Sequence, residues 1–85
     1  MMAEANEDIA NLVHSLVTPL VDFPEEIEIT SSEPEDGTIL VEIQVNEEDA
    51  GKVIGRQGRV IKAIRTVCRA AGSRNDMHVE IELID

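Results

Sequence analysis

The sequence is short and acidic, and both properties limit what it can be. Its 85 residues are 42% hydrophobic, which suffices for one compact domain but not for a second core. Phe23 is the single aromatic residue, so the core must be aliphatic. A net charge of −11 argues against a nucleic-acid partner when it is taken as an average over the whole chain.

No segment indicates secretion or a membrane span. Glu4, Glu7 and Asp8 stand where a signal peptide would carry positive charge. No apolar stretch approaches the roughly 20 residues that are needed to cross a bilayer. Cys68 is the only cysteine, so an internal disulfide is impossible. We therefore expect a cytoplasmic protein without membrane contact.

The first part of the chain predicts a helix, a strand and a turn. Apolar residues recur at three- and four-residue spacing over residues 5–18, as on one face of a helix. Pro19 should end or kink this helix because proline lacks the amide that would continue it. Ile27 and Ile29 then alternate with polar residues, which predicts a strand with one buried face. Residues 31–37 are rich in turn-forming residues and predict the turn of a hairpin.

The second part predicts another strand, two helices and a last strand. Residues 39–45 alternate and complete the hairpin, after which Asn46 is a good N-cap for a short helix ending near Ile54. Three acids at residues 47–49 suit the positive end of that helix. A third helix should extend to about Ala71, with Gly72 as its cap. The last strand contains the alternating apolar residues Val79, Ile81 and Leu83.

The predicted order is therefore α-β-β-α-α-β. This is an α+β fold, with the helices on one face of a three-stranded sheet.

Charge is strongly segregated along this order. All seven Lys and Arg residues lie between positions 52 and 74, and no Asp or Glu lies between Gly51 and Asn75. All eighteen acids lie outside that segment. A basic helix that merely balances acidic neighbours would produce the same distribution, so charge alone does not identify a binding site.

Two glycines bracket two polar residues inside the basic segment. Gly55 and Gly58 permit positive φ angles and let a ligand approach the backbone without a Cβ in the way. The amides that open the following helix lack partners and point outward, so a phosphate fits there. Arg56 and Gln57 should project from the tip of the loop toward such a ligand.

Further residues around the loop are candidates for the same site. A positive track follows the loop at spacings of three, three and four residues: Arg59, Lys62, Arg65 and Arg69. Four apolar residues flank the loop: Val53, Ile54, Val60 and Ile61. For Ile61 the core is the favoured interpretation.

Residues 54–58, with Ile61 behind them, match the Ile-Gly-x-x-Gly loop that joins two helices in the KH domain, and the resemblance spans nearly the whole chain. A helix and a strand precede the β-α-α-β unit, so the order is similar to the type II KH arrangement with its mixed sheet. Residues 51–59, the following Ala63-Ile64-Arg65 and the earlier Leu20-Val21-Asp22 resemble the small bacterial RNA-binding proteins of the KhpA family.

The resemblance implies one KH domain over residues 1–85 that holds about four unpaired nucleotides in a narrow groove. Val53, Ile54, Val60 and Ile61 would then be either the apolar floor of this groove or part of the core. It implies an RNA chaperone or post-transcriptional regulator that affects growth and division. The implied partners are single-stranded RNA, a second copy of the chain, and a larger Jag-type protein (KhpB). The RNA-binding residues would be Lys52, Ile54, Gly55, Arg56, Gln57, Gly58, Arg59, Lys62 and Arg65.

Other functions have weaker support in the sequence. RRM and cold-shock modules are excluded because they stack bases on several exposed aromatic rings. Catalysis has no evident nucleophile or base, because Cys68 lies on an apolar stripe and His14 and His78 lack partners. One cysteine and two distant histidines offer no metal cluster, and no cofactor is expected. The remaining alternative is a protein-interaction module that docks its basic helix on an acidic partner and binds RNA weakly.

Overall fold

The computed structural model describes residues 2–84. The helices and strands are α1 (Met2–Val17), β1 (Glu28–Glu35), β2 (Thr38–Gln44), α2 (Ala50–Ile54), α3 (Arg59–Ser73) and β3 (His78–Leu83). Short 3-10 turns occupy Thr18–Leu20, Pro24–Glu26 and Arg56–Gly58. The predicted order α-β-β-α-α-β is confirmed.

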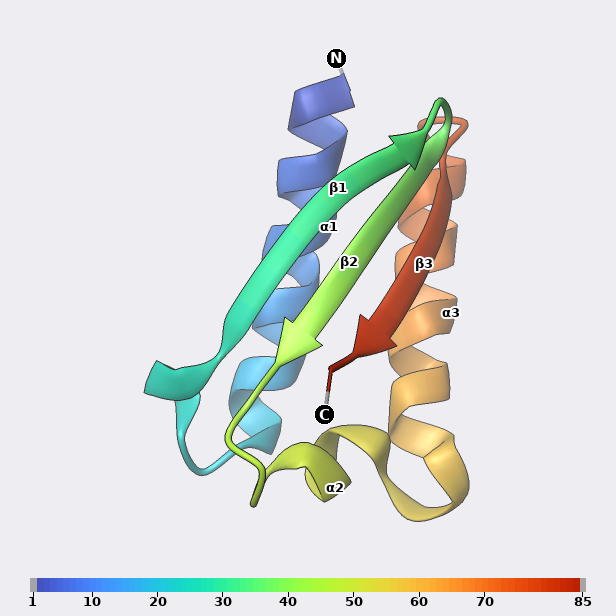
Figure 1. Ribbon diagram of the computed structural model, residues 1–85. Helices are drawn as coiled ribbons and strands as arrows, with labels where there is room; N and C mark the ends of the chain where they lie inside the picture. The colour runs from blue at the N-terminus through green and yellow to red at the C-terminus, as the bar shows by residue number, and fades with distance from the viewer. Residues whose placement is uncertain (1, 85) are drawn as a thin grey trace.

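The three strands form one mixed sheet with β2 in the centre. β1 pairs with β2 in the antiparallel sense, with Ile29 opposite Ile43, and β3 pairs with β2 in the parallel sense, with Ile81 opposite Val41. Both α1 and α3 cover the same face of this sheet, and α2 lies at its end, where β2 and β3 finish (Figure 1). The expectation of helices on one face is therefore correct.

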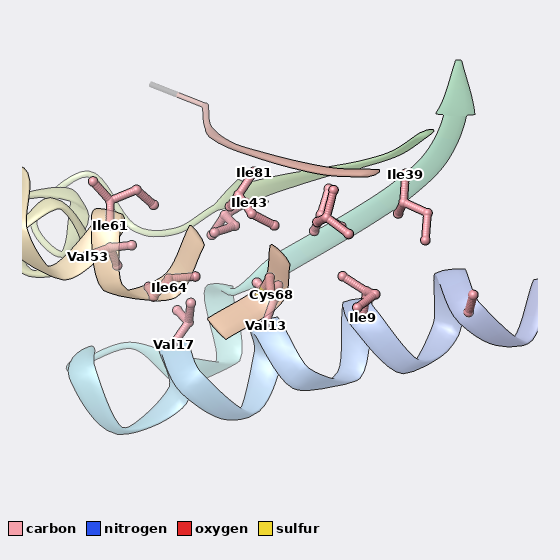
Figure 2. Packing of buried hydrophobic residues seen from close by; sticks show 13 residues of the cluster. Ile9, Val13, Val17, Ile39, Ile43, Val53, Ile61, Ile64, Cys68 and Ile81 are labelled. Carbon is pink, nitrogen blue, oxygen red and sulfur yellow. The ribbon is translucent and has the colours of Figure 1, made fainter. Parts of the chain in front are cut away.

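The core lies between the sheet and the two long helices and is built from aliphatic side chains (Figure 2). α1 contributes residues spaced four apart, and alternate residues of β2 and β3 face them. The buried set is Ala5, Ile9, Val13, Val17, Ile39, Val41, Ile43, Val53, Ile61, Ile64, Cys68, Val79 and Ile81. Burying one aliphatic side chain of this kind contributes roughly 1.5–3 kcal/mol, so the domain needs no aromatic packing.

The turn predicted over residues 31–37 is shorter in the structure than expected. β1 runs on to Glu35, and only Asp36 and Gly37 form the connection to β2. β1 is an edge strand with mostly exposed residues, so it lacks the buried alternation that marks a strand in a sequence. An edge strand also tolerates Pro34, and the register with β2 shifts between Ser32 and Glu35.

Three predicted helix boundaries, two of α1 and one of α3, also differ from the structure. α1 begins at Met2 rather than at residue 5, and it ends at Val17, one residue before the turn that contains Pro19. α3 continues to Ser73, so Gly72 lies inside the helix and does not cap it. A Cβ on Gly72 would lie 2.3 Å from Val79 Cγ2, which shows that this glycine permits close packing of α3 on β3.

The predicted N-cap at Asn46 is displaced as well. Asn46 Oδ1 accepts a hydrogen bond from the backbone N–H of Glu48 at 2.8 Å, so its side chain stabilises a turn that precedes the helix. α2 itself begins only at Ala50. It has five residues, too few for a helix to be stable by itself, so tertiary contacts must hold it in place.

Candidate nucleic-acid interface

The loop between α2 and α3 is a tight turn in which two glycines have positive φ angles. Gly55 has φ 77° and ψ 172°, a combination that is essentially restricted to glycine, and Gly58 has φ 74°. The Gly55 N–H donates to the Gly51 carbonyl at 2.8 Å, and the Gly58 N–H donates to the Gly55 carbonyl at 3.1 Å. These bonds close the end of α2 and place α3 directly behind the loop.

The two residues between the glycines form the exposed tip. Arg56 and Gln57 are both exposed, in agreement with the sequence-based expectation. Gln57 has φ 59°, a left-handed conformation that few non-glycine residues adopt. Arg59 Nη2 donates to Gln57 Oε1 at 3.3 Å, so the first residue of α3 leans toward the tip.

The basic side chains near the loop are largely free of acidic partners. Arg56, Arg59 and Lys62 are exposed, and among the side chains described over residues 5–84 none of them has a carboxylate at ion-pair distance. The opposite side of α3 carries buried residues of the core, including Ile64 and Cys68. Although the chain is strongly acidic, the cations beside the loop therefore remain available for an external anion.

Arg65 behaves differently from the other residues of the predicted positive track. It is half-buried, and its Nε donates to the backbone carbonyl of Ile81 at 3.3 Å. β3 is an edge strand, so the carbonyls on its outer side have no partner strand, and Arg65 supplies a donor to the carbonyl of Ile81. Arg65 thus joins α3 to β3 in addition to carrying a charge.

The structure separates the four apolar candidates around the loop. Val53 and Ile61 are buried core residues, which confirms the favoured interpretation of Ile61 and assigns Val53 to the core as well. Val60 is half-buried and packs against Gly55. Ile54 is 38% exposed at the last position of α2, so it is the one of the four that presents an apolar side chain to solvent beside the loop.

Lys52 is engaged by two carboxylates of the protein. Its Nζ donates to Asp49 Oδ1 at 3.0 Å and also forms an ion pair with Asp22. The basic segment and the KH resemblance placed Lys52 with the RNA-binding residues. These contacts occupy its ammonium group in the free protein. They raise the pKa of Lys52, because the hydrogen bond that it donates to Asp22, followed by the one that it donates to Asp49, favours the charged form.

Asp49 is a structural residue beside the loop whose role differs from the one expected from the sequence. It was expected to complement a helix dipole, but its side chain is fully buried and accepts the backbone N–H groups of Asp22 and Phe23, each at 3.0 Å. Burial would raise the pKa of Asp49, but these hydrogen bonds and that of Lys52 outweigh it and lower the pKa below its usual value. Asp49 therefore ties the connector before β1 to the start of α2.

The three residues considered for catalysis, Cys68, His14 and His78, do not come together in one site. Cys68 is buried in the core, and this burial raises the pKa of its thiol to about 11. His14 and His78 are exposed, and their nearest polar partners are Thr18 and Glu80. In the described part of the chain, no three His, Cys, Asp or Glu side chains are grouped to hold a metal ion. No helix within residues 2–84 has the length and apolar character of a membrane span.

Comparison with known proteins relates the whole of this arrangement to one family. The family model for the KH domain of KhpA and KhpB matches residues 10–83. The RNA-binding protein KhpA of Listeria monocytogenes is 47% identical over 74 residues, which cover 87% of this chain and 96% of the relative. The RNA-binding protein KhpA of Bacillus subtilis is 41% identical over 80 residues, which cover 94% of this chain and 98% of the relative.

A solved structure shares the fold at low sequence identity. The crystal structure of Era in complex with MgGDPNP and nucleotides 1506–1542 of 16S ribosomal RNA matches with a TM-score of 0.62 and 20% identity. The match covers 89% of this chain but only 30% of the Era chain, so this likeness concerns the fold alone. Taken with the family model and the KhpA relatives, it leads to one assignment: the chain belongs to the KhpA/KhpB family of bacterial KH domains.

Proposed function

We propose that this protein binds single-stranded RNA and that residues 55–58 clamp the RNA backbone. The observation that carries the proposal is the set of unpaired cations around the loop. In a chain with eighteen acids, Arg56, Arg59 and Lys62 face solvent without a carboxylate at ion-pair distance in the described residues. The similar proteins from Listeria and Bacillus are named RNA-binding proteins, which supports the same assignment.

Each part of the site has a definite role in this proposal. The glycines let the phosphodiester chain approach the loop, and the first amides of α3 face the phosphates. Arg56, Arg59 and Lys62 supply the positive charge, and Gln57 supplies a neutral amide at the tip. Ile54 provides an apolar surface for a base. Lys52 and Arg65 flank this centre and are already engaged with protein groups.

The proposed activity is non-enzymatic. A clamp on the backbone carries little base information, so the protein would act as an RNA chaperone or post-transcriptional regulator on many cytoplasmic transcripts, and through them on growth and division. Binding should weaken steeply with salt because the contacts are mainly to phosphates. The acidic remainder of the surface would keep the RNA at the loop.

The test compares two double variants with the same change in charge. Arg56→Asp with Gln57→Asp, and Arg74→Asp with Asn75→Asp, each remove one positive charge and add two negative charges. Residues 74 and 75 are exposed and follow the far end of α3. Asp tolerates the left-handed conformation of position 57, so the fold should survive in both proteins.

Binding of a short unpaired RNA is then titrated at two salt concentrations, and folding is checked by circular dichroism. We expect the loop variant to lose binding and the control variant to retain it within a few-fold. Equal binding by the wild type and a well-folded loop variant would refute the loop assignment. Equal loss in both variants would show that total charge, rather than the loop, controls binding.

We further propose that a second copy of the chain, or a KhpB-type KH protein in its place, docks beside α3. The supporting observation is an apolar hollow of about 200 Å³ between the end of α1 and α3, lined by Leu16, Leu20, Val60, Ala63, Ile64 and Val67. Val67, in the middle of α3, is 45% exposed. A large apolar side chain in such a hollow is typical of a contact surface.

This second proposal is tested by the mass of the protein in solution. Val67→Asp should convert a dimer to a monomer in analytical ultracentrifugation, whereas Thr66→Asp, at the neighbouring exposed position, should leave the dimer intact. A monomeric wild type at high concentration would exclude self-association. The same pair of variants would then be tested for binding to a KhpB-type protein.

A further inference from the structure

The ammonium group of Lys52 lies between two carboxylates that differ sharply in their surroundings. The Asp49 side chain is fully buried, whereas the Asp22 side chain is 72% exposed. Lys52 is intermediate, with 42% of its side chain exposed. One of its two partners is therefore inside the protein and the other is open to water.

The buried partner is fixed by the backbone. Asp49 Oδ1 accepts a hydrogen bond from the Asp22 N–H, and Oδ2 accepts one from the Phe23 N–H. Backbone donors therefore hold both carboxylate oxygens independently of Lys52. Asp49 needs the nearby ammonium because a buried carboxylate is unstable without compensation. We therefore expect Lys52 to remain attached to Asp49 whether or not a ligand is bound.

The exposed partner is exchangeable. The Asp22 carboxylate has Lys52 as its only ion-pair partner within residues 2–84. An ion pair with such exposure is screened by water and salt and forms and breaks readily. An external anion that reaches Lys52 can replace Asp22 without disturbing the fixed bonds of Asp49.

Lys52 also lies where such an anion would arrive. It is one helical turn before Gly55, on the exposed surface of α2, and the Gly55 N–H closes that turn. An ammonium has three hydrogen-bond donors, and two of them are used by the carboxylates. The cluster of Asp22, Asp49 and Lys52 contains two carboxylates and one ammonium, so it has a net negative charge beside the proposed RNA loop.

We infer that Asp22 competes with RNA for Lys52 and so restrains the RNA affinity of the loop. A phosphate at the α2 side of residues 55–58 displaces the Asp22 carboxylate from the ammonium, while Asp49 keeps the lysine in position. Asp22 is thus an affinity-determining residue that does not itself contact RNA. This inference rests on the proposed function and specifies how one cation of that site is controlled.

A double-mutant cycle tests the competition. RNA affinity is measured for the wild type, Asp22→Asn, Lys52→Met and the combination, with Glu25→Gln as a charge-matched control. Glu25 is an exposed acid of the same connector and forms no ion pair in the described residues. Urea unfolding of each protein verifies that the fold is retained.

We expect Asp22→Asn to bind roughly two- to fivefold more tightly, the range of one exposed ion pair, and to steepen the salt slope by about 0.7, one single-strand phosphate contact. Glu25→Gln should change affinity less than Asp22→Asn. In the Lys52→Met background the gain from Asp22→Asn should disappear.

If the gain persists without Lys52, or if Glu25→Gln reproduces it, Asp22 acts only through general charge and the inference is wrong. If the Lys52→Met variant does not fold, the RNA affinities of Asp22→Asn and Glu25→Gln still distinguish the two explanations. Both variants remove one negative charge, but only Asp22→Asn releases Lys52 from an ion pair. Absence of RNA binding by the wild type would overturn the proposed function itself. Wild-type binding without coupling between positions 22 and 52 would overturn this inference alone.

Discussion

Val60, the second residue of α3, packs directly against Gly55. A Cβ on Gly55 would come within 2.4 Å of Val60 Cγ2 and 2.8 Å of the Val60 backbone nitrogen. Gly58 has no such neighbour, because the nearest atoms to a Cβ there are 3.9 Å away. The two glycines of the loop are therefore required for different reasons, one by contact and conformation and the other by conformation alone.

This difference predicts unequal costs for the two alanine variants. Gly55→Ala should lower the free energy of unfolding by about 2–4 kcal/mol, since it combines a steric clash with an unfavourable φ. Gly58→Ala should cost about 1–2 kcal/mol, the typical penalty of a left-handed residue with a side chain. Urea unfolding of both variants measures these values. Equal costs would mean that Val60 moves aside without penalty.

Arg65→Ala should affect both RNA binding and stability. Loss of its charge should weaken binding alike for different RNA sequences and reduce the salt slope by about 0.7. Loss of its hydrogen bond to Ile81 should lower the free energy of unfolding by about 0.5–1.5 kcal/mol. Arg65→Lys should keep most of the salt slope. A loss that depends on the RNA sequence would instead indicate that Arg65 contacts bases.

Gly72→Ala should destabilise the fold although position 72 is helical. The added Cβ would approach Val79 Cγ2 to 2.3 Å and the Met77 carbonyl to 2.9 Å, so α3 and β3 would have to separate. Overpacking of this kind costs about 1–3 kcal/mol. Ser73→Ala, at the next and exposed position of the same helix, is the control and should change stability by less than about 0.5 kcal/mol.

The raised pKa of Cys68, about 11, predicts loss of stability in alkali. The unfolded thiol ionises near its ordinary value of 9.0, whereas the folded thiol does not. Its contribution is therefore complete below pH 9 and is lost as the pH rises toward 11. The folded protein should resist iodoacetamide at pH 8 and react after unfolding. Rapid labelling of the folded protein would contradict the burial of this thiol.

The lowered pKa of Asp49 predicts the opposite dependence in acid. Its contribution to stability is complete above the ordinary value of 3.8 and is lost as the pH falls through the lower folded value. Asp49→Asn should therefore be less stable than the wild type at pH 7, and this difference should shrink as the pH is lowered below 4. Urea unfolding at several pH values measures it. A difference that stays constant with pH would exclude ionisation of Asp49 as its cause.

The order of helices and strands could be predicted because each element has its own local pattern of apolar residues. The four-residue spacing of Ile9, Val13 and Val17 and the alternation of Ile39, Val41 and Ile43 each reflect burial on one face. β1 was partly missed because an edge strand with solvent on most of its residues leaves no such pattern between Ser31 and Glu35. The role of Gly72 could not be predicted either, because a glycine can end a helix or permit close packing, and the sequence does not distinguish the two.

The geometry of the candidate site could be predicted only where its residues are continuous in sequence. The exposed loop tip and its neighbouring cations lie within one segment, and their composition indicated them. The role of Asp49 was not accessible, because its partner Asp22 is 27 residues earlier and nothing in the spacing connects them. Whether Lys52 and Arg65 are free or engaged depends on such distant contacts and requires the structure.

The parallel pairing of β2 with β3 has a consequence for how the protein folds. β1 and β2 meet across a two-residue turn, so their hairpin can form early and locally. β3 can join β2 only after the chain from residue 45 to residue 77 has been arranged, because a parallel partner requires a long crossover. That crossover consists of α2, the glycine loop and α3. Formation of the glycine loop is therefore a precondition for completing the sheet, and a change that disturbs the loop should also slow the docking of β3.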